Sequence, residues 1–322
     1  MTSLIVAMAL LLSTPAVASP QAVDGHPECK ELEQAVAPAV AAGSSQTVDA
    51  ILAAASAAGR NTCVGLVLSQ LAGIALTSRR TADTERLAER SIKALEIDHA
   101  PGDPILLRPL HLLALARFEL GQTARARQAT QKMLEISTNR PQDLAMVHNM
   151  TAILLEHEGR LREAEAARLA AIRAHEEAHL SGSADYAVMV GTLGMLYTKL
   201  QRYPEAAAAL DRAAAILDAA PDAAQTDRIH LLLLRATLQG WQGQWRDAET
   251  KFRRALEMTD RLPYAEPRLV RQILTGYAVA LRKTRQPREA RTIEARAAAL
   301  PGGTAANSLV DITELRQKKP KR

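Results

Sequence analysis

The 322-residue chain has few aromatic residues. Phe, Trp and Tyr make up 3% of it, whereas hydrophobic residues of all kinds make up 48%, and these are mostly Ala and Leu. Ala and Leu are strong helix formers, while strands favour Val, Ile and the aromatic residues. The composition therefore predicts an all-α protein and argues against a fold based on β-sheets.

The common enzyme signatures are also missing. The sequence has no G-x-S-x-G turn, no phosphate loop of the G-x-x-x-x-G-K-S/T type and no Gly-rich dinucleotide turn. Its two cysteines do not form a CxxC motif, which leaves a redox motif without support. We therefore predict a protein that is not an enzyme and needs no cofactor.

The first eighteen residues, MTSLIVAMALLLSTPAVA, lack any charged side chain and end in an A-x-A motif. An apolar stretch followed by such a motif is typical of a secretory signal peptide, although here no Lys or Arg precedes the apolar run. The run from Leu4 to Leu12 is shorter than the roughly 20 residues of a membrane-spanning helix, which disfavours the alternative of an uncleaved anchor. We expect cleavage after Ala18 and a periplasmic or secreted protein.

Export would place Cys29 and Cys63 in an oxidising compartment, where two cysteines of one chain are able to pair. We predict a Cys29–Cys63 disulfide. The alternative is two free, buried thiols.

The net charge of +5 is matched by the last seven residues, 316–322, which carry five positive side chains and no negative one. A tail of this kind is most often a solvated chain end, and the alternative is contact with anionic envelope lipid. The rest of the chain shows no basic stripe interleaved with aromatic residues, so we predict no nucleic-acid partner.

A spacing of 42 residues organises the second half of the chain. Acidic-Ala pairs end at Ala164, Ala206, Ala248 and Ala290, and a second series follows seven residues later at Ala171, Ala213, Ala255 and Ala297. Small side chains at fixed intervals are typical of places where two helices cross closely. A turn precedes each pair, beginning at Gly159, Gln201, Gly243 and Arg285. Each turn is expected to separate two amphipathic helices.

These segments resemble tetratricopeptide repeats. The second helix of that repeat resembles three segments, GRLREAEAARLAAI, QRYPEAAAALDRAAAI and GQWRDAETKFRRAL. The end of its first helix resembles LGMLYTKL. The 42-residue spacing is similar to the kinesin-light-chain type of the repeat. The resemblance is strong over 143–299, fair back to 107, and degenerate over 29–97. It implies an all-α, right-handed superhelical solenoid of antiparallel helix pairs.

The domain prediction follows from these limits. We expect a signal peptide (1–18), an N-terminal helical cap with degenerate repeats (19–106), an array of about five repeats (107–299), and a C-terminal cap with the basic tail (300–322). The expected helices are 30–42, 47–59, 62–77, 82–97, 107–120, 123–136, 143–158, 161–179, 185–200, 203–219, 225–242, 245–261, 266–284, 287–299 and a short one at 308–316.

One stretch, HEEAHLSGSAD at 175–185, matches the metzincin zinc signature with Asp185 as third ligand. In a zinc peptidase His175 and His179 would bind the metal on one helical face while Glu176 polarised its water. However, the chain shows no strand run and no Met-turn, and the repeat pattern alone predicts Gly182 as a helix stop and Asp185 as an N-cap. We therefore favour a solvated helix end with no metal, and keep a structural or adventitious metal site and the zinc peptidase as alternatives.

The resemblance implies that a partner binds in a concave groove lined by first-helix positions. Transferring these positions to the sequence gives Phe118, Asn149, Ile153, His157, Met195, Lys199, His230, Leu233, Trp241, Arg282 and Lys283. Trp241 is the expected hot spot, with packing beneath a neighbouring helix as its alternative. The Lys and Asn pair by which some relatives hold a terminal carboxylate is missing.

The sequence therefore predicts an exported scaffold that binds a protein or peptide and has no chemistry of its own. The alternatives are the zinc peptidase and an assembly module that attaches to the envelope through its basic tail.

Overall fold

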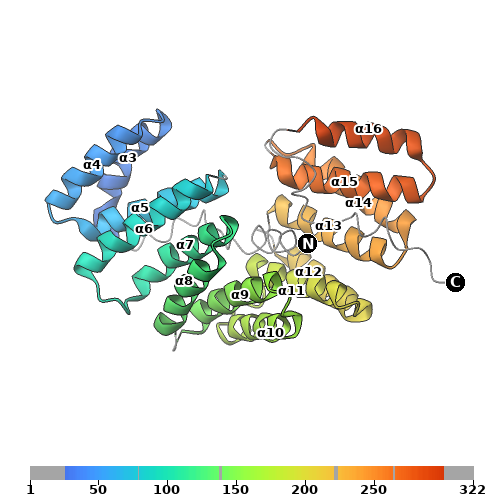
Figure 1. Cartoon of the computed structure of the whole chain (residues 1–322), viewed down its shortest axis with the longest axis horizontal. Helices are drawn as coiled ribbons and strands as arrows, with labels where there is room; N and C mark the ends of the chain where they lie inside the picture. The colour runs from blue at the N-terminus through green and yellow to red at the C-terminus, as the bar shows by residue number, and fades with distance from the viewer. Residues whose placement is uncertain (1–25, 79, 138–139, 221–223, 264, 301–322) are drawn as a thin grey trace. The chain divides into compact units, whose positions relative to one another are not determined.

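The computed structural model describes residues 26–78, 80–137, 140–220, 224–263 and 265–300, and within them the chain is built from α-helices with no strand (Figure 1). The predicted signal peptide, the helix at 308–316 and the basic tail lie outside the described residues. The helices are α3 (Lys30–Ala41), α4 (Ser45–Ala57), α5 (Asn61–Thr77), α6 (Thr81–Asp98), α7 (Leu107–Glu119), α8 (Thr123–Ile136), α9 (Pro141–His157), α10 (Leu161–Glu177), α11 (Ala184–Lys199), α12 (Tyr203–Ala219), α13 (Gln225–Trp241), α14 (Trp245–Thr259), α15 (Pro267–Lys283) and α16 (Pro287–Ala298). Two short 3₁₀ helices, η1 (Pro27–Cys29) and η2 (Pro104–Leu106), precede α3 and α7.

Each predicted helix from 30–42 to 287–299 has its counterpart, so the all-α fold class is confirmed. Pro204 lies in the first turn of α12 and Pro287 begins α16, as expected, because a helix's first N–H groups have no intrahelical acceptor. Pro141 lies just outside the predicted helix 143–158 but is the first residue of α9, and Pro267 is the first residue of α15.

The turns before the second helices share one backbone conformation. Gly159 and Gly243 have φ of 75° and 79°, in the left-handed region that glycine enters without strain. Gln201 and Arg285 occupy the same repeat position with φ of 61° and 67°, although a side chain there costs about 1 kcal/mol or more. The repeat therefore imposes its turn even where the residue does not favour it.

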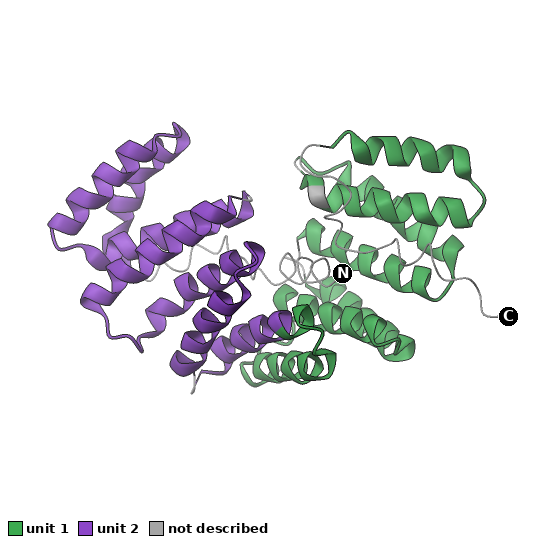
Figure 2. Ribbon diagram, in the orientation of Figure 1, with its two compact units in different colours: residues 1–14, 155–322 green, residues 15–154 purple. Residues whose placement is uncertain are grey.

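The chain divides into two compact units, which split α9 between Leu154 and Leu155 (Figure 2). Unit 2 covers residues 15–154 and unit 1 covers residues 1–14 and 155–322. Within unit 2, α5 packs against α6, α6 against α7, and α7 against α8. Within unit 1, consecutive helices from α10 to α16 pack in the same manner.

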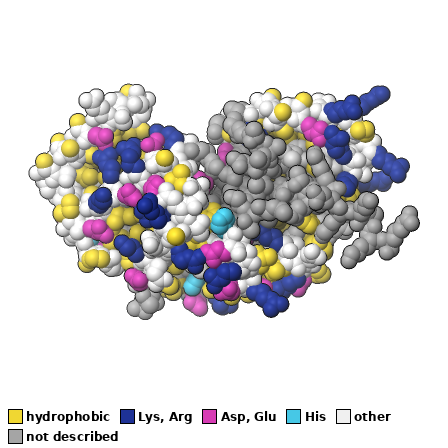
Figure 3. All heavy atoms as spheres, viewed as in Figure 1, with side chains coloured by type: hydrophobic (Ala, Val, Ile, Leu, Met, Phe, Trp, Pro, Cys, Tyr) yellow, Lys and Arg dark blue, Asp and Glu magenta, His cyan; other side chains and the backbone are white. Residues whose placement is uncertain are grey.

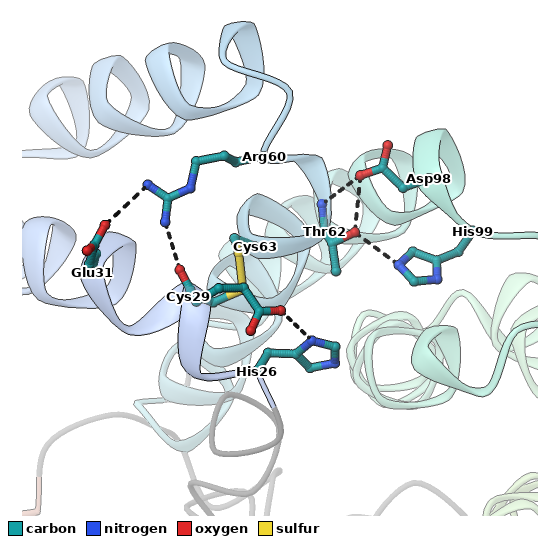
Figure 4. The surroundings of a disulfide bond; sticks show 9 residues. His26, Cys29, Glu31, Arg60, Thr62, Cys63, Asp98 and His99 are labelled. Atoms are coloured by element: carbon teal, nitrogen blue, oxygen red, sulfur yellow. Dashed lines mark hydrogen bonds and ion pairs between the residues drawn. A yellow bond between two sulfur atoms is a disulfide. The ribbon is translucent and has the colours of Figure 1, made fainter.

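In unit 2, Cys29 and Cys63 form a disulfide that joins η1 to α5 (Figure 4). Both residues are buried, and the bond closes a loop with a sequence separation of 34. Cross-linking a loop of this length stabilises the folded state by about 3 to 4 kcal/mol in the chain-entropy account. The disulfide therefore fixes the first helices of the chain to the array that follows.

The start of α5 is also held through the end of α6. The carboxylate of Asp98 accepts hydrogen bonds from the Thr62 N–H and hydroxyl, both at 3.1 Å (Figure 4). The first N–H groups of a helix lack intrahelical acceptors, so this carboxylate caps α5.

In unit 1 the alanine series marks the contacts between helices. Ala164, Ala206, Ala248 and Ala290 are each fully buried. In the second series Ala297 alone is partly exposed, since no described helix follows α16. The period in the sequence therefore corresponds to a period in the packing.

A polar contact between successive second helices repeats with a separation of 37 residues. Arg202, just before α12, donates to Glu165 of α10 at 2.7 Å, and Gln286, just before α16, donates to Glu249 of α14 at 3.0 Å. In unit 2, Gln122 donates to Glu85 at 3.2 Å in the same way. These contacts set the register of one repeat on the next.

Gly276 of α15 provides a test of this packing, because a Cβ there would overlap the ring of Phe252 from α14. We expect Gly276→Ala to lower the free energy of unfolding by about 1 to 3 kcal/mol despite alanine's better helix propensity. Gly182→Ala is the matched control, since a Cβ at Gly182 meets no atom within 4 Å. Equal stability of the two variants in urea denaturation would contradict this packing.

Candidate functional site

The zinc-like stretch does not assemble a metal site. Helix α10 ends at Glu177, and His179 takes a positive φ of 57°, so His175 and His179 do not continue on one helical face. The Glu176 carboxylate accepts hydrogen bonds from the Tyr186 hydroxyl at 2.5 Å and from Arg212 at 2.9 Å. No group of three metal-binding side chains occurs among the described residues.

Two details predicted for this connection were wrong. Helix α10 ends at Glu177 and the left-handed residue that follows it is His179, so Gly182 is not the helix stop. The N-cap of α11 is Ser183 and not Asp185, because the Ser183 hydroxyl accepts the Tyr186 N–H at 3.1 Å. Asp185 lies instead in the first turn of α11, where a carboxylate interacts favourably with the helix dipole.

The first-helix residues predicted to line a groove differ widely in exposure. Six of them are buried: Phe118, Asn149, Ile153, Met195, His230 and Leu233. His157, Lys199 and Trp241 are partly exposed, and Arg282 and Lys283 are exposed.

Lys199 belongs to a buried ion cluster of three helices. The Glu156 carboxylate from α9 accepts Arg168 Nε at 3.0 Å and Nη2 at 2.8 Å on one oxygen, and Lys199 Nζ at 2.6 Å on the other. The side chains of Arg168 and Glu156 are 1% and 3% exposed. Burial lowers the pKa of Lys199, and the Glu156 charge opposes that shift. This cluster joins α9, α10 and α11.

The two basic residues at the end of α15 have partners on the neighbouring helices α16 and α14. The Arg282 guanidinium makes two hydrogen bonds to the Glu294 carboxylate of α16, at 2.8 and 2.6 Å. The Lys283 ammonium lies 5.5 Å from the centre of the Trp245 ring. Trp245 itself is partly exposed at the start of α14.

Two buried polar side chains in unit 1 have no hydrogen-bond partner among the described residues. His230 of α13 is 8% exposed and Gln272 of α15 is 2% exposed, and neither ring nitrogen nor either amide atom is bonded. They stand 42 residues apart at one repeat position, on helices that contact each other. Burial lowers the pKa of His230 to about 4, so its ring is neutral at pH 7. An unsatisfied buried polar group is costly, which marks this pair as the candidate site.

His230 was predicted from the sequence to line the groove, and Gln272 has the same register 42 residues later. Register alone did not distinguish His230 from buried neighbours such as Leu233. Arg168 was missed altogether, because a charged residue on a second helix is normally exposed. The one available signal of burial was its position in the repeat, because the next two repeats have the apolar residues Leu210 and Phe252 there.

No family model and no curated protein matches the chain. The solved structures of RapI in its apo form (14% identity, TM-score 0.59), BtubC from P. vanneervenii (19%, 0.54) and NprR with its cognate peptide NprX (12%, 0.57) are similar. The matches cover 84%, 72% and 85% of this chain, and 99%, 97% and 78% of the respective structures.

These likenesses show the fold. The chain is a helical array of the tetratricopeptide-repeat type, as its sequence resemblance implied. Among the described residues, each helix is too short or too polar to span a bilayer.

Proposed function

We propose that this protein is an exported scaffold that binds an extended segment of a protein or peptide along the first helices α11, α13 and α15 of unit 1, without catalysing a reaction. The observation that carries the proposal is the pair His230 and Gln272, whose four polar side-chain atoms are buried and unbonded. A ligand that bonded them would relieve the cost of leaving them unsatisfied, and this requires the two side chains to turn out of their buried positions when the ligand binds.

The chemistry of the pair favours a neutral amide. The Gln272 side chain offers one carbonyl acceptor and one NH₂ donor, which match the N–H and C=O of a peptide unit. Neutral His230 likewise offers one donor and one acceptor. Both residues therefore suit a peptide backbone better than a charged group.

Other observations support parts of this proposal. The similar structure of NprR was solved with a bound peptide, which makes a peptide a reasonable class of ligand for this fold. The Cys29–Cys63 disulfide fits an oxidising compartment, periplasmic or extracellular, and the A-x-A motif fits export. The clusters around Glu176 and Glu156 are occupied by intramolecular partners, which favours a role without chemistry.

The test is selection of ligands from a displayed peptide library, followed by affinity measurement with the mature chain. We expect His230→Leu combined with Gln272→Leu to bind the selected peptides at least about tenfold more weakly, because the hydrogen bonds to the ligand are lost. The folded state should be as stable or more stable, since apolar side chains replace unsatisfied polar ones.

Gln242→Leu is the matched control, because Gln242 is an exposed glutamine at the end of α13. It should bind like the wild type. Enrichment of no peptide, or equal affinity of the double variant, would refute the proposal.

A further inference from the structure

Positive charge is concentrated at one end of the chain. Residues 245–300 carry 13 Lys and Arg against 7 Asp and Glu, whereas residues 26–244 carry 22 against 25. A near-neutral body thus contains a basic end, which lies entirely within unit 1. Charge asymmetry of this size points to an anionic partner.

Five exposed arginines of α14 and α16 form what we term the arginine face: Arg246, Arg253, Arg254, Arg288 and Arg291. Arg246 and Arg253 are seven residues apart and Arg288 and Arg291 three apart, spacings that place each pair on one side of its helix. Arg246 and Arg288 also occupy the same repeat position, 42 residues apart.

The two helices that carry this face are held side by side. Gln286, just before α16, bonds Glu249 of α14 at 3.0 Å, and Arg296 near the end of α16 pairs with Asp260 just after α14. Lys and Arg side chains project from this end of the molecule, at the right-hand edge of Figure 3. The arginines of both helices therefore belong to one continuous surface.

Within the described part of the chain, none of the five arginines makes an ion pair or hydrogen bond through its guanidinium. Some exposed arginines of earlier repeats are paired instead, as in Arg160–Glu163 and Arg202–Glu205. The same helices expose three carboxylates, Asp247, Glu257 and Glu289, and Glu289 accepts the Tyr277 hydroxyl at 3.2 Å. The face therefore keeps an excess of unpaired positive charge.

We propose that the arginine face docks on the phosphate groups of an anionic phospholipid surface. One guanidinium group is able to bind two phosphate oxygens at once. Each basic side chain near an anionic leaflet also adds to membrane affinity. This proposal is independent of peptide binding by α11, α13 and α15, and it concerns folded helices and not the basic tail.

Two other partners fit less well. Protein interfaces have an apolar or aromatic core, but the large hydrophobic side chains that are exposed among the described residues all lie before residue 245. Single-stranded nucleic acid needs stacking aromatic side chains, whereas Phe252 and Tyr277 are buried and Lys283 lies over Trp245. Export, which we propose above, would also separate the protein from nucleic acid.

The experiment is co-sedimentation of the full chain with phosphatidylcholine vesicles, with and without phosphatidylglycerol. We expect binding only to the anionic vesicles, and weakening by added salt. A quadruple variant should reduce the partition coefficient at least about a hundredfold, because each arginine contributes roughly fivefold to membrane affinity. Its substitutions are Arg246→Gln, Arg253→Gln, Arg288→Gln and Arg291→Gln.

The control removes the same charge from exposed arginines on second helices elsewhere, by Arg86→Gln, Arg125→Gln, Arg162→Gln and Arg173→Gln. It should retain most of the binding. The proposal is overturned if anionic vesicles are not bound, if both quadruple variants bind alike, or if deletion of 316–322 alone abolishes binding. Tighter binding to duplex DNA than to vesicles at equal salt would also overturn it.

Discussion

Glu156→Gln is expected to lower the free energy of unfolding by about 3 to 5 kcal/mol, because it leaves two buried cations without their counter-charge. The wild-type carboxylate bonds Arg168 and Lys199 while only 3% exposed. Glutamine has nearly the same shape but no charge. The loss would therefore measure the electrostatic role of the carboxylate and not its volume.

The ionisation of Glu156 supports this expectation. Burial by itself would raise the pKa of the carboxyl, but the charges of Arg168 and Lys199 outweigh burial and lower it. A carboxyl whose pKa is lowered by folding contributes stability at pH values above its unfolded pKa, and that contribution is lost as the pH falls through the folded value. Urea denaturation at pH 7 therefore captures the full effect.

Glu158→Gln is the matched control two residues away, since Glu158 lies at an exposed position and its ion pair with Arg160 is solvated. It should cost less than about 1 kcal/mol. Equal effects of the two substitutions would mean that the buried cluster adds nothing to stability beyond a surface pair.

In the next repeat, uncharged residues occupy the positions equivalent to this ion cluster. Thr198, Leu210 and Trp241 stand 42 residues after Glu156, Arg168 and Lys199. Replacing all three with those residues should recover most of the stability lost in Glu156→Gln, because apolar side chains often replace buried ion clusters at little cost. Failure to recover would show that the three charges position α9, α10 and α11 in a way that apolar packing does not reproduce.

The fold was predictable because the period in the sequence is also the period of the packing. Ala206 and Ala248 recur where helices cross, and only a small side chain fits there. Gln201 and Arg285 could be assigned to the turn from register alone, although neither residue favours a positive φ. The 42-residue period therefore predicted these turns even where the residue itself does not favour one.

The site was less predictable, because a side chain's partner depends on neighbours far along the chain. Arg282 and Lys283 occupy first-helix positions that were predicted to line the groove. Their partners Glu294 and Trp245 lie on α16 and α14. Ser183 and Asp185 are both good N-cap residues, and the choice between them depends on where the preceding helix ends. Register places a residue on a helix without fixing what it contacts.

The basic end was missed for a different reason. The body balances to zero when counted as a whole, which concealed the excess of Lys and Arg after residue 245. A count by segment would have found that excess. The ion pairs that neutralise arginines elsewhere, such as Arg212 with Glu176, required the structure.

Acidification is expected to destabilise both units through buried histidines, chiefly His111 in unit 2 and His230 in unit 1. Burial, reinforced by the charge of Arg108, lowers the pKa of His111 in unit 2 to about 4, and burial does the same for His230 in unit 1. Both ring nitrogens of each lack a partner among the described residues. The unfolded chain takes up the proton near pH 6.5 and the folded chain only near pH 4, so stability is full above pH 6.5 and falls below it. The loss at pH 4 is about 3 kcal/mol per histidine.

His111→Leu tests this reasoning in unit 2, because leucine fills a similar buried space and cannot be protonated. We expect the variant to be more stable than the wild type at pH 7 by about 1 to 3 kcal/mol, since an unsatisfied polar group is removed. The difference in free energy of unfolding between the variant and the wild type should grow as the pH falls from 6.5 to 4, because only the wild type loses stability through His111. His179→Gln is the control and should leave the acid dependence unchanged, because it removes an exposed imidazole and leaves His111 and His230 in place. If urea denaturation gives His111→Leu the same pH dependence as the wild type, folding does not lower the pKa of His111, and this account of the acid sensitivity is wrong.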